Sequence, residues 1–109
     1  MSKRIDNLQG SLELLVLKTL EGGANHGFGI TLHVKKASED LLQIEEGSLY
    51  PALHRLERTK MISSSWKVTE NGRRARFYSL TPSGKKRLAE VRDNWKTVAR
   101  GVKKVLRFS

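Results

Sequence analysis

Apolar residues recur at helical spacing in three separate segments of the first sixty residues, and these segments predict three short helices. The first segment, residues 11–21, reads SLELLVLKTLE and is stopped by Gly22-Gly23. The second covers residues 30–37, and the third covers residues 47–59 with the sequence GSLYPALHRLERT. Because only a few residues connect the first two segments, we expect their helices to be neighbours in space.

The third predicted helix has one apolar and one basic face. Its apolar face consists of Leu49, Leu53 and Leu56. Its opposite face carries His54, Arg55 and Arg58. We expect Ser48 to cap this helix and Pro51 to fall in the first turn, where the missing N–H of proline costs little. The helix should therefore pack on a core through its leucines and present a basic surface to the outside.

The pattern then changes from helical to alternating, which predicts a β-hairpin. Apolar and polar residues alternate over residues 62–68 (ISSSWKV), and residues 75–80 (ARFYSL) form the returning strand. Residues 69–74 form the turn between them, in which Asn71-Gly72 is a strong hairpin signal.

The register of this hairpin depends on the length of its turn. A strict two-residue loop would place Trp66 opposite Phe77, with Tyr78 and Leu80 on the other face. A longer loop would shift the pairing. The sequence therefore leaves open which of the aromatic side chains faces the core.

A single long helix is predicted from Thr81-Pro82 to the end of the chain, with Thr81 as the N-cap and proline at the first helical position. Its apolar positions are spaced alternately by three and four residues: Leu88, Val91, Trp95, Val98, Val102 and Val105. We call this set the apolar strip. The spacing is that of a coiled coil, and a core of three short helices is too small to bury all of it. We expect the strip to pair with a second copy of the chain; the alternative is a helix folded back on its own domain.

Composition adds a strong positive charge to this picture. The chain has 109 residues, with 21 Lys and Arg against 11 Asp and Glu, a formal net charge of +10 and a pI near 10.3. The length fits one domain, and the charge favours a polyanionic partner, nucleic acid first of all. The chain has no cysteine, which excludes a disulfide scaffold, thiol catalysis and a cysteine-ligated metal.

Neither a membrane span nor a signal peptide is predicted. The longest apolar run, residues 14–17, is far too short to cross a bilayer. Asp6 and Asn7 follow Met1-Ser2-Lys3-Arg4 in place of an apolar segment. We therefore expect a cytoplasmic protein.

Catalytic and metal sites are not predicted either. His26, His33 and His54 have no acidic ligand at metal spacing, and Ser48 lacks the second glycine of a nucleophile elbow. The run His26-Gly27-Phe28-Gly29 is interpreted as a turn whose glycines supply only backbone freedom. We expect no enzymatic activity, no cofactor and no metal.

The order of elements is that of a winged helix-turn-helix followed by a long helix. We expect a mainly α fold with a small two-stranded β-hairpin, divided into a DNA-binding domain over residues 1–80 and a C-terminal dimerisation helix over residues 81–109. In such a fold the third helix enters the major groove. The hairpin, or wing, lies along the DNA backbone or reaches into the neighbouring minor groove.

Both elements carry candidate DNA contacts. Those on the third helix and just after it are Ser48, Tyr50, His54, Arg55, Arg58 and Lys60. Those on the wing are Lys67, Arg73, Arg74 and Arg76. We expect Arg55 and His54 to read base edges, with Arg55 on a guanine. The wing cations and Lys60 should contact phosphates.

Four motifs resemble the PadR-like transcriptional regulators, in order and over roughly residues 8–106. The specific ones are the run GSLYPALHRLE, residues 47–57, and the junction YSLTPSG, residues 78–84; LQGSLELLVL, residues 8–17, and HGFG, residues 26–29, also match. The family usually has tyrosine where Phe28 stands, so a hydroxyl is absent there. The single C-terminal helix resembles the short subfamily.

The resemblance implies a homodimeric bacterial repressor, sometimes relieved by small aromatic ligands. It assigns Ser48, Tyr50, Pro51 and His54 to positions of the recognition helix. Two roles stay open for Tyr50: it acts as a recognition-helix residue at the DNA, or its ring packs under the helix and offers only its hydroxyl to a phosphate. Two also stay open for Trp95, which is either a large apolar filler or one of a pair of rings that admit a flat aromatic effector between two protomers.

Two rival functions remain at this point. One is a winged-helix module that binds DNA or RNA inside a replication, phage or ribosome-associated assembly without a regulatory ligand. The other is a protein-interaction module whose basic face is incidental, although such a module needs no charge of +10.

Overall fold

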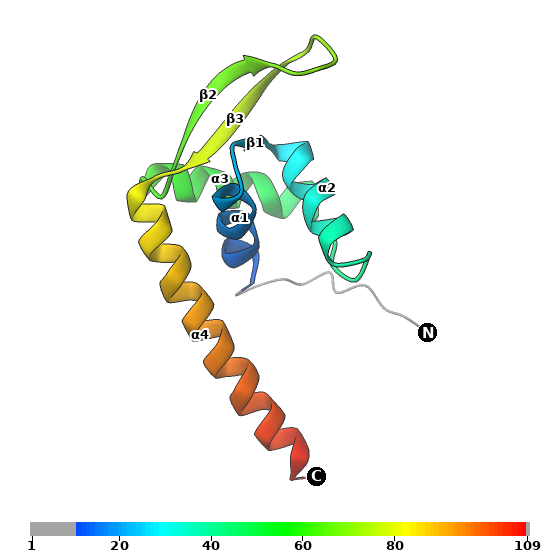
Figure 1. Ribbon diagram of the computed structural model, residues 1–109, viewed down its shortest axis with the longest axis vertical. Helices are drawn as coiled ribbons and strands as arrows, with labels where there is room; N and C mark the ends of the chain where they lie inside the picture. Colours follow the sequence, from blue (N-terminus) through cyan, green and yellow to red (C-terminus); the bar gives the residue numbers. More distant parts are fainter. Residues whose placement is uncertain (1–10, 109) are drawn as a thin grey trace.

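The computed structural model describes residues 11–108 as a mainly helical fold with a small antiparallel sheet (Figure 1). The helices are α1 (Leu12–Glu21), α2 (Gly27–Ala37), α3 (Glu46–Arg58) and α4 (Pro82–Arg107). The strands are β1 (Asn25–His26), β2 (Ile62–Val68) and β3 (Arg74–Leu80). The predicted order of three helices, a hairpin and a long helix is confirmed. The N-terminal residues on which the signal-peptide prediction rests lie outside the described residues, as do residues 8–10 of the first family motif.

The first turns of α2 and α3 differ from the prediction. α2 begins at Gly27, three residues early, because His26 caps it: the Gly29 amide donates to the imidazole Nδ1 at 3.1 Å. α3 begins at Glu46, with Glu45 in the N-cap position. Ser48 therefore lies inside the first turn, and the expectation that it caps the helix is wrong.

The sheet contains one strand more than predicted. The two residues of β1 pair antiparallel with β3, so the strand order is β1-β3-β2. Asn25 lies opposite Tyr78, and His26 opposite Phe77. A two-residue strand has no alternation to detect. β1 nevertheless ties the start of α2 to the wing.

The hairpin adopts the register of a longer turn. The amide of Thr69 donates to the carbonyl of Arg73 at 2.7 Å, and Trp66 lies opposite Arg76. Trp66 and Tyr78 consequently share one face of the sheet, where the strict two-residue loop would have separated them. Tyr78 is buried at the base of the wing, whereas Trp66 is more than half exposed further out.

The core lies between α1, α2, α3, the base of the sheet and the first turns of α4. Its largest fully buried side chains are Leu17, Ile30, Leu49, Leu53, Ile62, Leu88 and Val16. Leu56 is also buried, so the three leucines predicted to form the apolar face of α3 all face this core. As a result the other side of α3 is turned outward.

α4 starts within the core and then leaves it. Thr81 caps the helix as predicted, accepting a hydrogen bond from the Gly84 amide at 3.0 Å. Leu88 is buried, Val91 is partly buried, and Arg87 forms an ion pair with Glu13 of α1 at 2.9 Å. Beyond these residues the helix extends away from the rest of the chain, on the side opposite the wing tip (Figure 1).

This arrangement divides the apolar strip into two parts. Leu88 belongs to the core of its own chain and has no surface left for a partner. The four residues further along are exposed: Trp95 (47%), Val98 (54%), Val102 (50%) and Val105 (72%). Only this second part is available to a second copy.

Candidate nucleic-acid interface

The outward side of α3 is polar and largely basic. Because its leucines are buried, the helix presents the side chains between them to solvent. Exposed on it are Ser48, Tyr50, His54, Arg55 and Arg58. Lys60 is exposed in the turn that follows, where it adopts a left-handed backbone with φ of 66°. The candidate contacts of this helix thus share one surface.

The cations of the wing lie over aromatic rings. The guanidinium of Arg74 lies 5.2 Å from the centre of the Trp66 ring, and the ammonium of Lys67 lies 5.8 Å from that of Phe77. Both geometries are cation–π contacts, which hold a charge on an apolar surface while leaving it open to solvent. Arg73 is exposed in the turn. The wing therefore offers positive charge along its length.

Arg76 has a different environment from the other wing cations. Its Nε donates to the hydroxyl of Ser64 at 2.9 Å, and its Nη2 donates to the carboxylate of Glu57 at 3.1 Å. Ser64 in turn donates to the same carboxylate. Arg76 is thus tied to α3, and its guanidinium is already engaged within the chain.

Glu57 and Ser64 are functional candidates that sequence reasoning missed. They lie seven residues apart, on α3 and β2, and they meet only because the wing folds back beside the helix. The hydrogen bond from Ser64, together with Arg76, holds the pKa of Glu57 below its usual value. The sequence offered one signal for Glu57, an acid among the basic positions His54, Arg55 and Arg58.

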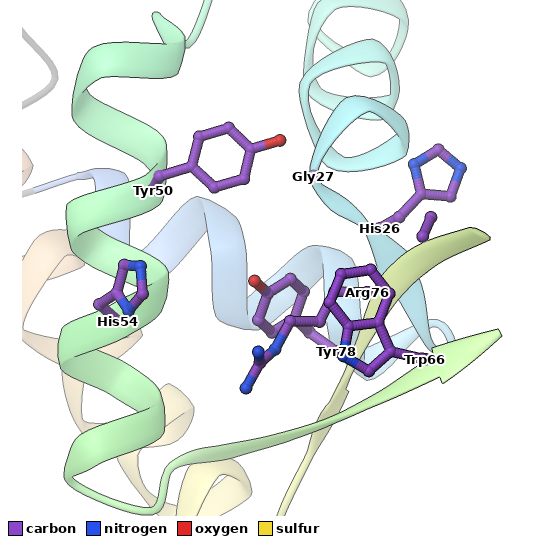
Figure 2. A pocket seen from close by; sticks show the side chains of 8 residues that line it. His26, Gly27, Tyr50, His54, Trp66, Arg76 and Tyr78 are labelled. Carbon is purple, nitrogen blue, oxygen red and sulfur yellow. The ribbon is translucent and has the colours of Figure 1, made fainter. Parts of the chain in front are cut away.

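A hollow of about 390 Å³ opens between α3 and the wing (Figure 2). It is lined by His26, Gly27, Tyr50, His54, Trp66, Ala75, Arg76 and Tyr78. These residues come from five elements and include four kinds of aromatic or cationic side chain but no acid. Burial raises the pKa of Tyr78 at its base. The hollow lies between the two elements that were predicted to bind DNA.

Tyr50 lines one side of this hollow, and its position bears on the two roles that were predicted for it. Its ring extends from α3 toward the start of α2 (Figure 2). A Cβ built on Gly27 would lie 2.6 Å from the Tyr50 hydroxyl, so the absence of a side chain at Gly27 leaves room for the Tyr50 ring in this position. The interpretation that the glycines of this turn supply only backbone freedom is therefore wrong for Gly27. The ring is 42% exposed, so packing and solvent access are combined.

Metal-binding clusters and membrane-spanning helices are both absent from residues 11–108. No group of three or more His, Cys, Asp or Glu side chains in this range could hold a metal ion. None of the helices in the same range is both long enough and apolar enough to cross a membrane.

Comparison with known proteins identifies the chain. The family model "Transcriptional regulator PadR-like family" matches residues 16–90. A relative from Mycobacterium tuberculosis, Transcriptional regulator Rv3488, is 32% identical over 94 residues, which cover 86% of this chain and 84% of the relative.

Solved structures agree with the family match. A transcriptional regulator from Clostridium thermocellum is 27% identical with a TM-score of 0.81, covering 89% of this chain and 94% of that one. A PadR-like transcriptional regulator from Bacillus cereus is also 27% identical, with a TM-score of 0.75, covering 91% and 94%. With a winged helix that carries a basic surface, and with the family model spanning most of its length, this chain belongs to the PadR-like family of transcriptional regulators.

Proposed function

We propose that this protein is a homodimeric repressor that binds an inverted-repeat operator in bacterial double-stranded DNA. The observation that carries this proposal is the outward basic side of α3 next to a wing rich in cations, on a chain with a net charge of +10. An operator-bound dimer would prevent RNA polymerase from occupying the same promoter. Such a protein would act in the cytoplasm.

In this proposal α3 reads sequence in the major groove. Arg55 is a candidate for two parallel hydrogen bonds to a guanine edge, the most common specific contact of arginine with DNA. His54 lies one residue earlier on the same exposed side. Ser48, Tyr50 and Arg58 lie near the two ends of the helix, where they would meet either base edges or phosphates.

The wing and the end of α3 would supply affinity rather than specificity. Lys60, Lys67, Arg73 and Arg74 are exposed. Each cation that neutralises a phosphate releases condensed counterions, so binding should weaken steeply as salt is added. The cation–π contacts of Lys67 and Arg74 reduce the freedom of both side chains before DNA arrives.

Dimerisation is proposed through the exposed part of α4. The exposed part of the apolar strip lies beyond the point where α4 leaves its own core and consists of Trp95, Val98, Val102 and Val105. A second copy presents the same strip, so a two-fold pairing would bury both. The division into a DNA-binding unit over residues 1–80 and a dimerisation helix over 81–109 is kept as a proposal, although the first turns of the helix, with Leu88 and Val91, pack on the core of the DNA-binding unit.

Trp95 is the proposed contact for a small planar aromatic effector. It lies at the start of the exposed strip, where two copies of the helix would diverge toward their own DNA-binding units. A ligand held there could change operator affinity only by binding more tightly to one spacing of those units than to the other. The simpler alternative is that Trp95 fills the dimer interface.

Footprinting on the DNA upstream of the protein's own gene tests the proposal. We expect protection of two inverted half-sites whose centres are separated by about 10–10.5 bp or a multiple of it. A symmetric footprint and a dimer in sedimentation at micromolar concentration would support a repressor. A single asymmetric footprint from a stable monomer would favour a nucleic-acid-binding module of a larger assembly.

A further inference from the structure

Glu57 has an unexpected position for an acid on a DNA-binding surface. It lies on α3 between His54 and Arg58, near the C-terminal end of the helix that is proposed to enter the major groove. Its side chain is about 30% exposed. A carboxylate there should repel DNA phosphates, so its presence requires a compensating role.

Three hydrogen-bonded side chains connect α3 to both strands of the wing. Glu57 of α3 accepts from Ser64 of β2, and it accepts from Arg76 of β3 at 3.1 Å. Arg76 also donates to Ser64 at 2.9 Å. Each member thus contacts the other two, so the cluster fixes both the distance and the angle between helix and wing.

β1 holds β3 as far out as Phe77, which lies opposite His26, whereas the Glu57 cluster connects both strands of the wing to α3. Ile62, Leu80 and Tyr78 anchor the base of the hairpin in the core. Beyond Ser64, the residues of β2 are all exposed within the described chain. The cluster therefore lies at the level where the wing leaves the core.

We propose that Glu57 is a positioning residue for DNA binding: through Ser64 and Arg76 it holds the wing beside α3 so that both elements reach one duplex. This inference rests on the proposed function. It reverses the sign expected from charge alone, because removing a negative charge from the DNA-facing surface should then weaken binding. It also changes the role of Arg76, which acts through this cluster rather than primarily as a phosphate contact.

The hollow between α3 and the wing supports this assignment. Arg76 and Tyr78 form one side of it, and Tyr50 and His54 form the other. Arg76 thus belongs both to the cluster and to the lining of the hollow. If the cluster were broken, the hollow could close or widen, and the spacing of the two DNA-binding elements would change with it.

Glu57→Ala and Ser64→Ala test the proposal by binding to a labelled 30-bp duplex at low salt, followed by fluorescence anisotropy. The first substitution removes a negative charge and the second changes no charge. We expect both to raise Kd by about threefold to tenfold, the range of coupling within a side-chain network. Ser64→Thr keeps the hydroxyl and should restore binding.

Glu70→Ala is the matched control. Glu70 is exposed in the turn of the wing, so its removal changes the charge of the DNA-facing surface equally without touching the cluster. Its Kd should stay the same or fall. The double variant Glu57→Ala with Ser64→Ala should bind about as well as either single variant, because the two residues act as one unit.

The outcomes separate this inference from the function on which it rests. Failure of the wild-type protein to bind any duplex would overturn both. If the wild type binds and Glu57→Ala binds equally well or better, as Glu70→Ala does, Glu57 is only a solvated acid and the positioning role is wrong.

A second measurement, made without DNA, tests whether the cluster exists in solution. In a ¹⁵N spectrum the Nε–H of Arg76 should exchange slowly with solvent in the wild type and rapidly in Ser64→Ala. Rapid exchange in the wild type would overturn the cluster itself, even if binding weakened in the variants. Thermal melts of each variant establish that the fold is retained.

Discussion

The hydroxyl of Tyr50 lies against the backbone of Gly27, and a methyl group on Gly27 would come within 2.6 Å of it. This contact joins the start of α2 to the outward side of α3. It places the aromatic ring of Tyr50 at the edge of the hollow beside the wing (Figure 2). The space left by Gly27 of α2 is therefore occupied by an exposed side chain of α3.

Gly27→Ala should affect DNA binding more than stability. The group that must move is the free end of a 42% exposed side chain, so we expect a stability loss below about 1 kcal/mol. The displaced ring should weaken binding to duplex DNA. Urea unfolding and anisotropy measure the two effects.

Gly84→Ala provides the contrast for that experiment. A Cβ on Gly84 would collide with the backbone carbonyl of Met61, which has no freedom to rotate away. We expect a loss of about 1–3 kcal/mol from this overpacking. If Gly27→Ala were equally destabilising, Tyr50 would be fixed in place and the interpretation of the contact would be wrong.

Arg55→Ala and Arg74→Ala should weaken operator binding in different ways. Loss of a base contact by Arg55 should cost about 1–3 kcal/mol and relax the preference at one base position. Loss of a phosphate contact by Arg74 should weaken binding to all sequences and reduce the salt slope by about one. Titrations at several salt concentrations, on operator and unrelated DNA, distinguish them. Unchanged affinity in both variants would mean that α3 and the wing do not contact DNA.

Two substitutions in α4 should separate folding from assembly. Leu88→Ala removes a fully buried side chain from the core of its own chain and should destabilise the fold by about 2–5 kcal/mol. Val102→Asp places a charge in the exposed strip and should leave the monomer folded while dissociating the dimer. Sedimentation and thermal unfolding are the measurements. A dimer that survives Val102→Asp would place the interface elsewhere.

Trp95 should report an aromatic effector by its fluorescence. In a Trp66→Phe background, planar aromatic compounds should quench Trp95 and weaken operator binding. Trp95→Leu should lose both responses and remain a dimer. If Trp95→Leu instead dissociates the dimer and no aromatic compound quenches the fluorescence, the residue is part of the interface core alone.

The Glu57 carboxylate should make stability depend on pH in the acidic range. Its pKa is lowered in the folded state by Ser64 and Arg76, from an ordinary value of 4.5. Its contribution is therefore complete above that value and is lost as pH falls through the lower folded pKa. Because the pair is partly exposed, the contribution should be below about 1 kcal/mol.

Urea unfolding of wild type and Glu57→Gln measures this difference. The difference in the free energy of unfolding between the two proteins should be constant from pH 5 upward, because the Glu57 carboxyl is then ionised in both the folded and the unfolded state. It should narrow toward pH 3 as the carboxylate protonates. A gap that widens on acidification would contradict the direction of the shift.

The helices were predictable because burial enforces their pattern. Leu49, Leu53 and Leu56 identified the inner face of α3, and that in turn identified the outward residues. The same logic failed to distinguish Leu88 from Val102, because an apolar position has the same signature whether its own core or a partner covers it. Only the three-dimensional packing of α4 on α1 separates them.

The wing was less predictable because its register depends on turn geometry. The alternation from Ile62 to Val68 predicted the strand but left its register open. The longer turn places Trp66 opposite Arg76, where a two-residue loop would have placed it opposite Phe77. Every contact across the sheet follows from that register, including the meeting of Arg76 with Ser64 and Glu57. Contacts between residues up to 19 positions apart leave no periodic trace in one sequence.

α4 is continuous from the capped turn at Thr81 to Arg107, with no break between its buried and exposed parts. At a rise of 1.5 Å per residue, the segment from Leu88 to Val105 is about 25 Å long. It is therefore a rigid rod, and the end that carries Leu88 is packed in the core of the proposed DNA-binding unit. In the proposed dimer, a tilt of α4 by about 10° at its far end would displace the DNA-binding unit by about 4 Å, more than one base-pair step. A small change in the angle between the two α4 helices would consequently decide whether both DNA-binding units fit the half-sites of one operator.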